Sequence, residues 1–252
     1  FIQQTLHMLH KTKGIVLPGI KFGDTSIIAN IFTELFGIQS YIVKGIRKQS
    51  KKKPNNAAFF QPGAILDLEV YHNDLKNLQY IKEYSWAFLY ERVFFDVVKN
   101  AVVTFNLELL QHVLKQPGSL PELFEFTETS LHYADEAPPS GSANLPLFFM
   151  LQLGRLLGFQ LSGKFIESTP VLDLQAGEFV QEIPNHSFFL LQEDANTSSE
   201  LNEITEFSSL EKLVLNREKR RTLLSAYLQY IKLHSEGLNE LKSFLIMQEV
   251  LS

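Results

Sequence analysis

A dense run of cationic side chains is the part of this sequence most suited to binding chemistry. Residues 44–53 read Lys-Gly-Ile-Arg-Lys-Gln-Ser-Lys-Lys-Lys, which places six positive charges and no acidic residue in a chain whose formal net charge is −5. Positive charge that opposes the overall balance indicates a local anionic partner, such as the phosphate backbone of a nucleic acid. The competing interpretation is a lysine-rich surface loop that serves only solubility.

A second cationic cluster lies at residues 217–221, where Arg217, Arg220 and Arg221 share one face of a predicted helix. This cluster is a candidate site for a phosphate group or for an acidic protein tail, and Arg155 is a further candidate for the same role. The alternative is a solvated helix face whose opposite side packs into the core.

The sequence offers little support for enzyme chemistry. The segment Gly158–Lys164 matches the G-x-x-x-x-G-K pattern of phosphate-binding loops, but Phe165 stands where magnesium binding needs Ser or Thr, and the segment follows a predicted helix instead of a strand. The chain has no Cys, which excludes disulfides, thiolate zinc sites and cysteine nucleophiles. The seven His residues are scattered, and the three on predicted helices, His112, His132 and His234, have no His partner three or four residues away. We therefore predict no catalytic residues, no cofactor and no metal site.

Short apolar segments predict the strands that position the cationic run. Five of them precede residue 85, at residues 14–17, 25–32, 38–43, 64–71 and 78–84. They are apolar or rich in β-branched residues, and 64–71 alternates clearly between apolar and polar positions. Asn73-Asp74 predicts a hairpin turn between the last two. Five short strands with one long polar insertion favour a small closed barrel, of which the OB-fold is the common five-stranded form.

An OB barrel would give the cationic run a role, because its grooves bind single strands by combining lysine contacts with base stacking. Lys21 is a secondary candidate for a backbone contact and Tyr41 for stacking. The principal predicted phosphate contacts are the six cations of the run: Lys44, Arg47, Lys48, Lys51, Lys52 and Lys53.

After residue 84 the apolar period becomes helical. We expect helices at residues 86–115, 121–133, 145–157, 217–234 and from about 238 to 251, with a capping box at Ser208–Glu211 opening another. Residues 135–144 predict a flexible loop. The fold class is therefore α+β: an OB-fold domain at 8–84 and a mostly helical domain at 85–252, with an irregular insert at about 160–207 that has strand-like pieces at 171–174 and 188–191.

Charge is distributed unevenly along the chain. Residues 1–83 hold 11 Lys and Arg against 6 Asp and Glu, whereas residues 84–252 hold 12 against 22. The split predicts that the second region binds protein, because its net charge would repel DNA. No apolar run approaches the roughly 18 residues of a membrane span, and residues 1–7 have no signal-peptide pattern. We expect a soluble, cytoplasmic protein without a membrane partner.

Several motifs of the first third resemble the RecO family of DNA repair proteins. They occur in the family's order at Gly14–Leu17, Phe22–Ile28, Ile31–Glu34 with Gly37, Val43–Arg47 and Phe60–Pro62. The segment Arg155–Phe159 is similar to the end of a helix in the family's second domain. None of these motifs is catalytic.

The resemblance implies a non-enzymatic recombination mediator with an N-terminal OB-fold and a helical C-terminal domain. Such a protein binds single- and double-stranded DNA and anneals complementary strands. It acts on the nucleoid with RecR on DNA coated by the single-strand-binding protein, and so helps RecA to load.

The resemblance also implies that the acidic, apolar C-terminal tail of the single-strand-binding protein is bound, and Arg155 and residues 217–221 are the candidates to receive it. Many family members carry a four-cysteine zinc module, which a chain without Cys cannot form, so residues 160–190 would be a metal-free remnant. The alternative function is an adaptor whose OB barrel binds protein without direct DNA contact.

Overall fold

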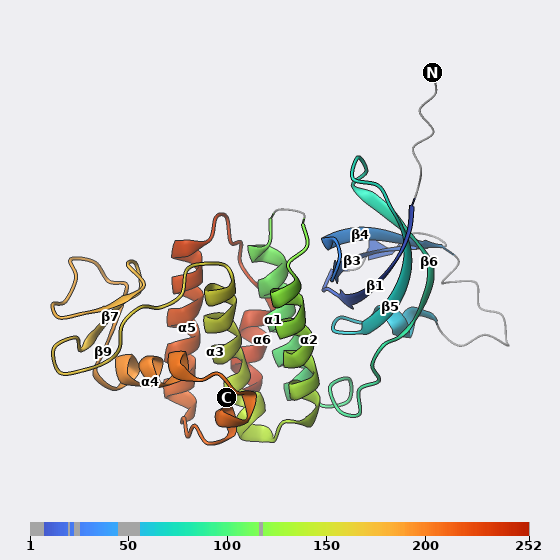
Figure 1. Ribbon diagram of the computed structural model, residues 1–252. Coiled ribbons are helices and arrows are strands. Elements are labelled where there is room, and N and C mark those ends of the chain that lie inside the picture. Colours follow the sequence, from blue (N-terminus) through green and yellow to red (C-terminus); the bar gives the residue numbers. More distant parts are fainter. Residues whose placement is uncertain (1–7, 20, 23–25, 45–55, 116–117, 252) are drawn as a thin grey trace. The chain divides into compact units, whose positions relative to one another are not determined.

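The computed structural model describes residues 8–19, 21–22, 26–44, 56–115 and 118–251 (Figure 1). The chain divides into two compact units, each built from two stretches of sequence: residues 1–90 with 114–128, and residues 91–113 with 129–252. The first unit holds strands β1–β6, and the second holds α1, α3–α6 and strands β7–β9.

A closed five-stranded barrel of the OB-fold type forms the first unit. Its strands are β1 (Met8–Val16), β3 (Ser26–Thr33), β4 (Gly37–Lys44), β5 (Ile65–His72) and β6 (Leu78–Trp86). They pair in the order β1-β5-β6-β4-β3, and pairing of β3 with β1 closes the ring; only β4 and β6 run parallel. The short β2 (Lys21–Phe22) pairs with β3, and a 3-10 helix, η1, spans Asn56–Phe60. The predicted barrel is confirmed, although its first strand begins at Met8 rather than Gly14.

Residues 114–128 pack against this barrel within the first unit. The rings of Phe124 and Phe32 lie 5.4 Å apart, and Lys13 Nζ lies 2.8 Å from Glu128 Oε1. Gly37 has a φ of +65°, and a Cβ there would stand 2.0 Å from the carbonyl oxygen of Gly118. The turn that begins β4 therefore requires glycine, both for its left-handed backbone and for this close approach.

Six helices dominate the described part of the remaining chain. They are α1 (Val97–Val113), α2 (Pro121–Glu136), α3 (Pro139–Leu156), α4 (Gln192–Glu203), α5 (Arg217–His234) and α6 (Lys242–Val250). In the second unit α3 is the central helix, buried almost throughout from Gly141 to Gly154, and α1, α4 and α5 pack against it. Within the described residues, no helix combines the length and apolar character needed to cross a bilayer.

The structure corrects three predictions for this region. Trp86 ends β6, residues 87–96 form bends and turns, and the helix expected from residue 86 begins only at Val97. The loop expected at 135–144 is the end of α2 followed by the first turns of α3, because proline suits a first helical turn, where no N–H is needed. Ser208 and Glu211 do not cap an α-helix but lie in a 3-10 helix, η2 (Phe207–Glu211).

The insert at 160–207 contains a small sheet and α4. Its strands are β7 (Val171–Asp173), β8 (Glu178–Val180) and β9 (Phe189–Leu191), with β7 in the centre. The two predicted strand-like pieces are confirmed as β7 and β9. An ion pair at 3.3 Å joins Asp173 to His186, and His234 on α5 bonds the carbonyl of Leu174 at 3.0 Å.

Candidate nucleic-acid interface

One outer face of the barrel presents a half-exposed surface across β3, β4 and β6. Strand register places Ile28 beside Ile42 and Asn30 beside Ser40, and the parallel pairing adds Leu78 and Tyr80. The intervening residues of these strands, Ala29, Tyr41 and Gln79 among them, point into the barrel and are buried. We call the outward set the platform: Ile28, Asn30, Ser40, Ile42, Lys44, Leu78 and Tyr80.

Tyr80 and Lys44 form the open end of the platform. Tyr80 is 40% exposed, and the Lys44 ammonium lies 5.4 Å from the centre of its ring. Among the residues that the structure describes, no carboxylate forms an ion pair with Lys44. A flat aromatic face beside an unneutralised ammonium is the combination that binds a stacked base and its phosphate.

The cationic run begins where the platform ends, because β4 finishes at Lys44. The other predicted phosphate contacts, Arg47, Lys48, Lys51, Lys52 and Lys53, lie outside the described residues, so their roles stay predictions. Lys21 pairs with Ile28 in the β2–β3 ladder, which puts its backbone beside the platform.

Tyr41 does not match its predicted stacking role. Its side chain is 0% exposed among the barrel residues, and burial raises the pKa of its phenol. The ring therefore has no free face for a base. Tyr80 instead presents an exposed ring on the same sheet. Sequence reasoning missed it because alternation alone did not tell which face of its strand looked outward.

A second feature that sequence reasoning missed lies at the β5–β6 turn, whose predicted hairpin is confirmed. Gln79 is 2% exposed, and its side chain accepts from the N–H of Asn73 at 3.0 Å and donates to the carbonyls of Asn73 and Lys76 at 2.9 and 2.6 Å. The turn is thus held rigidly, with Lys76 exposed. It borders a pocket of about 580 Å³ that also includes Ser40 of the platform and Lys115.

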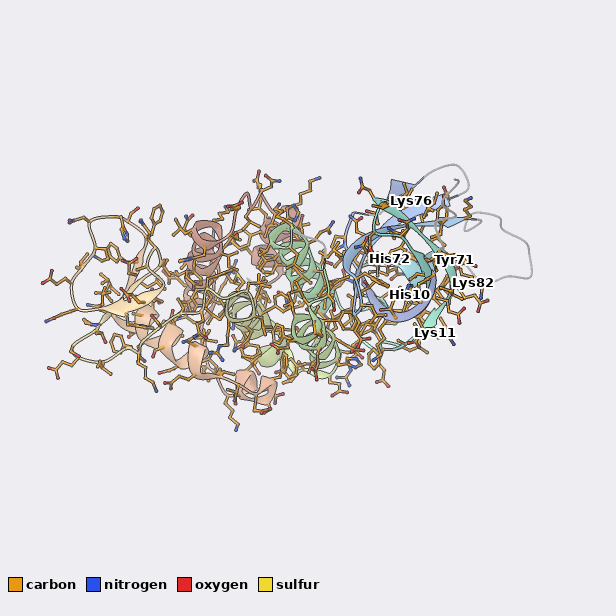
Figure 2. All side chains as sticks on the ribbon, turned by 45° about the horizontal axis from the view of Figure 1, so that its top comes forward. His10, Lys11, Tyr71, His72, Lys76 and Lys82 are labelled. Carbon is orange, nitrogen blue, oxygen red and sulfur yellow. The ribbon has the colours of Figure 1, made fainter. Side chains whose placement is uncertain are left out.

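The β1–β5 side of the barrel is different in charge. Glu69 accepts ion pairs from Lys11 at 3.3 Å and from Lys82 at 3.1 Å, and these three residues belong to adjacent strands. Figure 2 shows Lys11 and Lys82 on this side of the barrel and Lys76 near the β5–β6 turn. Because the lysines of this face already form ion pairs, they are less available to bind phosphate groups than the lysine of the platform.

The predicted second anion site is only partly assembled. Arg217 and Arg221 are exposed on α5 and, with Arg220, line a small cavity of about 10 Å³ that Leu224 and Leu251 also border. Arg220 is less available to a ligand, because its guanidinium donates to Asn144 Oδ1 at 3.3 Å and to the carbonyl of Leu215 at 3.0 Å. Burial also lowers the pKa of Arg220.

Arg155 does not join this cluster. Its guanidinium donates to the carbonyl of Asn202 at 2.8 Å. Asn144, the partner of Arg220, lies on the same helix α3 but eleven residues earlier, so the two positions are separated by about 16 Å along the helix axis. Arg217, Arg220 and Arg221 therefore lie together, and Arg155 lies apart from them.

The remaining chemical candidates stay without a site. Lys164 forms an ion pair with Glu203, and the backbone after Gly163 does not open a helix, so the segment lacks the geometry of a phosphate-binding loop. Across the described ranges, no three His, Asp or Glu side chains converge as a metal site would need.

Comparison with known proteins gives one consistent result over nearly the whole chain. The model of "Recombination protein O N terminal" matches residues 8–90, and that of "Recombination protein O C terminal" matches residues 95–243. A DNA repair protein RecO from Azobacteroides pseudotrichonymphae is 30% identical over 96% of this chain and 99% of its own length. Those from Flavobacterium psychrophilum and Porphyromonas gingivalis are 31% and 26% identical, over 96% and 90% of this chain and 99% and 93% of their own lengths.

Proposed function

Because the chain belongs to the RecO family of DNA repair and recombination proteins, we propose that it is a non-enzymatic mediator that binds single- and double-stranded DNA and anneals complementary strands. The observation that carries this proposal is the platform, whose exposed Tyr80 and unneutralised Lys44 lead directly into the cationic run. Its place of work would be the nucleoid.

Annealing needs no nucleophile and no cofactor. Two strands must be brought together although their phosphates repel, and a cationic surface lowers this repulsion while releasing condensed counterions. Stacking on Tyr80 would hold a base away from its neighbours at a gain of about 1–3 kcal/mol per base, which leaves its pairing edge free. Ile28, Ile42 and Leu78 extend the apolar area over which an unstacked base can lie.

Charge reversal in the run tests the DNA-binding proposal. Lys51→Glu, Lys52→Glu and Lys53→Glu together should weaken binding of a labelled single-stranded oligonucleotide for every sequence alike, and should reduce the slope of log affinity against log salt by about 2, at about 0.7 per contact. The matched control reverses three exposed lysines of the second unit, Lys212, Lys232 and Lys242. Equal losses in both variants would reject the assignment to the run.

We propose further that the protein works with RecR on DNA coated by the single-strand-binding protein, and so promotes loading of RecA. The surface beside Arg217 and Arg221 is the candidate for the acidic, apolar tail of the single-strand-binding protein, because guanidinium groups pair with carboxylates and the half-buried Leu251 offers apolar contact. Arg217→Gln with Arg221→Gln should weaken binding of a labelled tail peptide by about fivefold or more. Lys212→Gln with Lys232→Gln is the control, and equal affinity in both variants would place the tail elsewhere.

A further inference from the structure

The pocket beside the β5–β6 turn has a volume of about 580 Å³ and lies within the first unit. Its lining comes from three stretches of the chain, within residues 35–40, 72–79 and 114–119. We call it the turn pocket. It includes Ser40 of the platform and two lysines, Lys76 and Lys115, that belong neither to the platform nor to the cationic run.

Local hydrogen bonds hold these two lysines at the pocket although they are far apart in the sequence. The buried side chain of Gln79 donates to two carbonyls of the turn that carries Lys76, at 2.9 and 2.6 Å. Ser119 Oγ donates to the carbonyl of Glu34 at 2.7 Å, which ties the stretch after Lys115 to the β3–β4 turn. Both lysines are therefore mounted on anchored backbone.

Both ammonium groups are available to an anion. Lys76 and Lys115 are exposed, and within the described part of the chain neither has a carboxylate at ion-pair distance. Asp74 is the one carboxylate among the lining residues, and its Oδ1 already lies 2.8 Å from His72 Nε2. The pocket therefore favours an anionic ligand.

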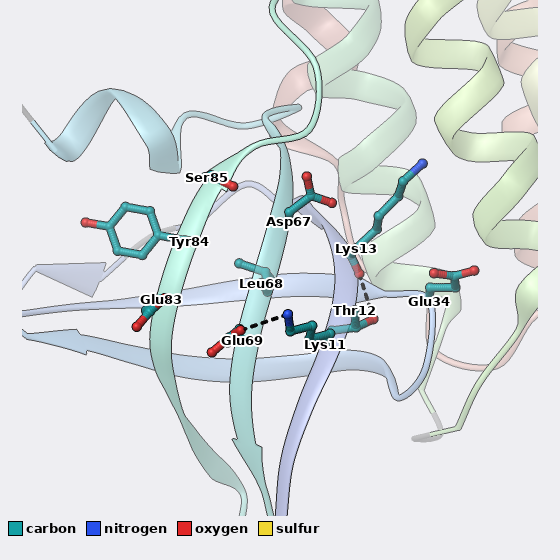
Figure 3. A pocket seen from close by; sticks show the side chains of 10 residues that line it. All are labelled: Lys11, Thr12, Lys13, Glu34, Asp67, Leu68, Glu69, Glu83, Tyr84 and Ser85. Carbon is teal, nitrogen blue, oxygen red and sulfur yellow. Dashed lines mark hydrogen bonds and ion pairs between the residues drawn. The ribbon is translucent and has the colours of Figure 1, made fainter.

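The lysines on the neighbouring side of the barrel, across β1, β5 and β6, are already paired. Figure 3 shows Lys11 directed toward Glu69, at 3.3 Å, and Lys82 lies 3.1 Å from the same carboxylate. Lys13 pairs with Glu128 at 2.8 Å. A strand that leaves the platform therefore meets paired cations on that side and unpaired ones in the turn pocket.

The aromatic rings of the turn pocket pack against each other. Phe36 is stacked on His72 with ring centres 3.9 Å apart, and His10 makes a T-shaped contact with Phe36 at 5.1 Å. These rings are less available to a base than the exposed ring of Tyr80. Unpaired lysines without a free ring suit the phosphates of a nucleic acid and not its bases.

Strand register makes the pocket a continuation of the platform. Lys44 and Ser40 are four residues apart on β4, a distance of about 13 Å. Ser40 pairs with Leu78, and Lys76 precedes Leu78 by two residues, which adds at most about 7 Å. The path from Lys44 to Lys76 is then about 20 Å, the length of about six nucleotides at the stacked rise of about 3.4 Å.

We propose that a single strand of DNA bound on the platform continues into the turn pocket, where Lys76 and Lys115 bind its phosphates. This inference rests on the proposed DNA-binding function and adds a path to it, along β4 from the cationic run to the β5–β6 turn. A path of this length fits the roughly 4–16 nucleotides that one OB barrel binds.

Oligonucleotide binding to the full chain tests the proposal. The probe is a fluorescein-labelled oligothymidylate of about 12 nucleotides, which is longer than the path, and anisotropy measures its affinity across a salt series. Lys76→Gln with Lys115→Gln should weaken binding by about fivefold or more. The same variant should reduce the slope of log affinity against log salt by about 1.4, at about 0.7 per contact.

The matched control is Lys11→Gln with Lys82→Gln. It removes the same charge from exposed positions of the same barrel, but from lysines that Glu69 already holds, and it should leave the slope unchanged. Equal losses in the two variants would indicate a general effect of barrel charge and would overturn the proposal.

Two further results would overturn it. If the pocket variant binds DNA as the unmodified chain does, while charge reversal at residues 51–53 still weakens binding, the strand does not reach the pocket and the DNA-binding function stands. In that case, a labelled Glu-Ser-Glu-Ser-Glu peptide bound by the unmodified chain but not by the pocket variant would assign the pocket to an acidic protein segment. No binding of the oligonucleotide by the unmodified chain would overturn the DNA-binding function and this inference together.

Discussion

Asp135 shows how much a single side chain can organise. Its carboxylate is 3% exposed and accepts the backbone N–H groups of Glu91, Arg92 and Val93 at 2.8–2.9 Å. These bonds fix the turns that precede α1. Adjacent carboxylates in a polar stretch give no sign in the sequence that one of them turns inward.

Replacing Asp135 should destabilise the protein in a pH-dependent way. Burial alone would raise the pKa of Asp135, but its three backbone hydrogen bonds outweigh burial and lower it below the ordinary value of 3.8. Its contribution is therefore complete above that value and is lost as pH falls through the lowered pKa. At neutral pH we expect Asp135→Asn to reduce the free energy of unfolding in urea by about 2–3 kcal/mol.

Glu136→Gln is the matched control, since Glu136 is exposed and next in the chain. The Asn variant should also lose less stability than the unmodified chain when the pH is lowered to about 3. The same acid dependence in both proteins would show that Asp135 is not responsible.

Tyr80 is the residue on which single-strand preference should depend. Tyr80→Ala should weaken binding of a single-stranded oligonucleotide by about 1–3 kcal/mol, because stacking on an exposed ring is lost. Binding of a duplex, whose bases are already stacked, should change much less. Phe95→Ala, which removes a ring that is 82% exposed in the second unit, is the control, and an equal effect of both changes in a fluorescence titration would contradict the stacking role.

At the level of elements, periodic patterns predicted the strands and helices. They gave no sign of structure that depends on a single long-range contact. Alternation predicted the five barrel strands, and the helical period predicted α5 with its observed bounds, Arg217–His234. Residues 87–96 were predicted as helix because their apolar side chains mimic a helical stripe. Asp135 instead binds the backbone N–H groups of residues 91–93, and the segment forms bends and turns. A hydrogen bond between residues more than forty positions apart leaves no local signal in the sequence.

The corner between α2 and α3 provides an element-scale prediction. Lys99 on α1 is 7% exposed, and its ammonium donates to the carbonyls of Ala134 and Ala137 at 2.6 and 2.7 Å and to Ser142 Oγ at 3.3 Å. Burial lowers the pKa of Lys99. Because this ammonium satisfies carbonyls at the end of α2, it joins three helices at one point.

Lys99→Met keeps the length of the side chain but removes the donors. We expect a loss of about 2–3 kcal/mol in the free energy of unfolding, because buried carbonyls are left without partners. Lys232→Met, at an exposed position of α5, should change stability by less than about 0.5 kcal/mol. A calorimetric melting temperature unchanged by Lys99→Met would contradict this account of the corner.

For the whole molecule, the sequence shows which region carries the positive charge, but not which of its side chains face outward. The charge split between residues 1–83 and 84–252 pointed to the barrel region. The platform and the burial of Tyr41 follow from which face of each strand looks inward, and this is fixed only when the barrel closes. Likewise, Arg155 and Arg220 looked equivalent until packing gave them different partners.

The covering of the barrel by residues 114–128 has a consequence for synthesis. The last barrel strand ends at Trp86, but Phe124, which packs on Phe32, belongs to a stretch that ends 38 residues after the first stretch of this unit. At about 5–20 residues per second, a ribosome needs about 2–8 s to make these 38 residues. During this interval the nascent barrel lacks its covering segment and can bind chaperones. A protein that ends at residue 90 would lack this segment permanently.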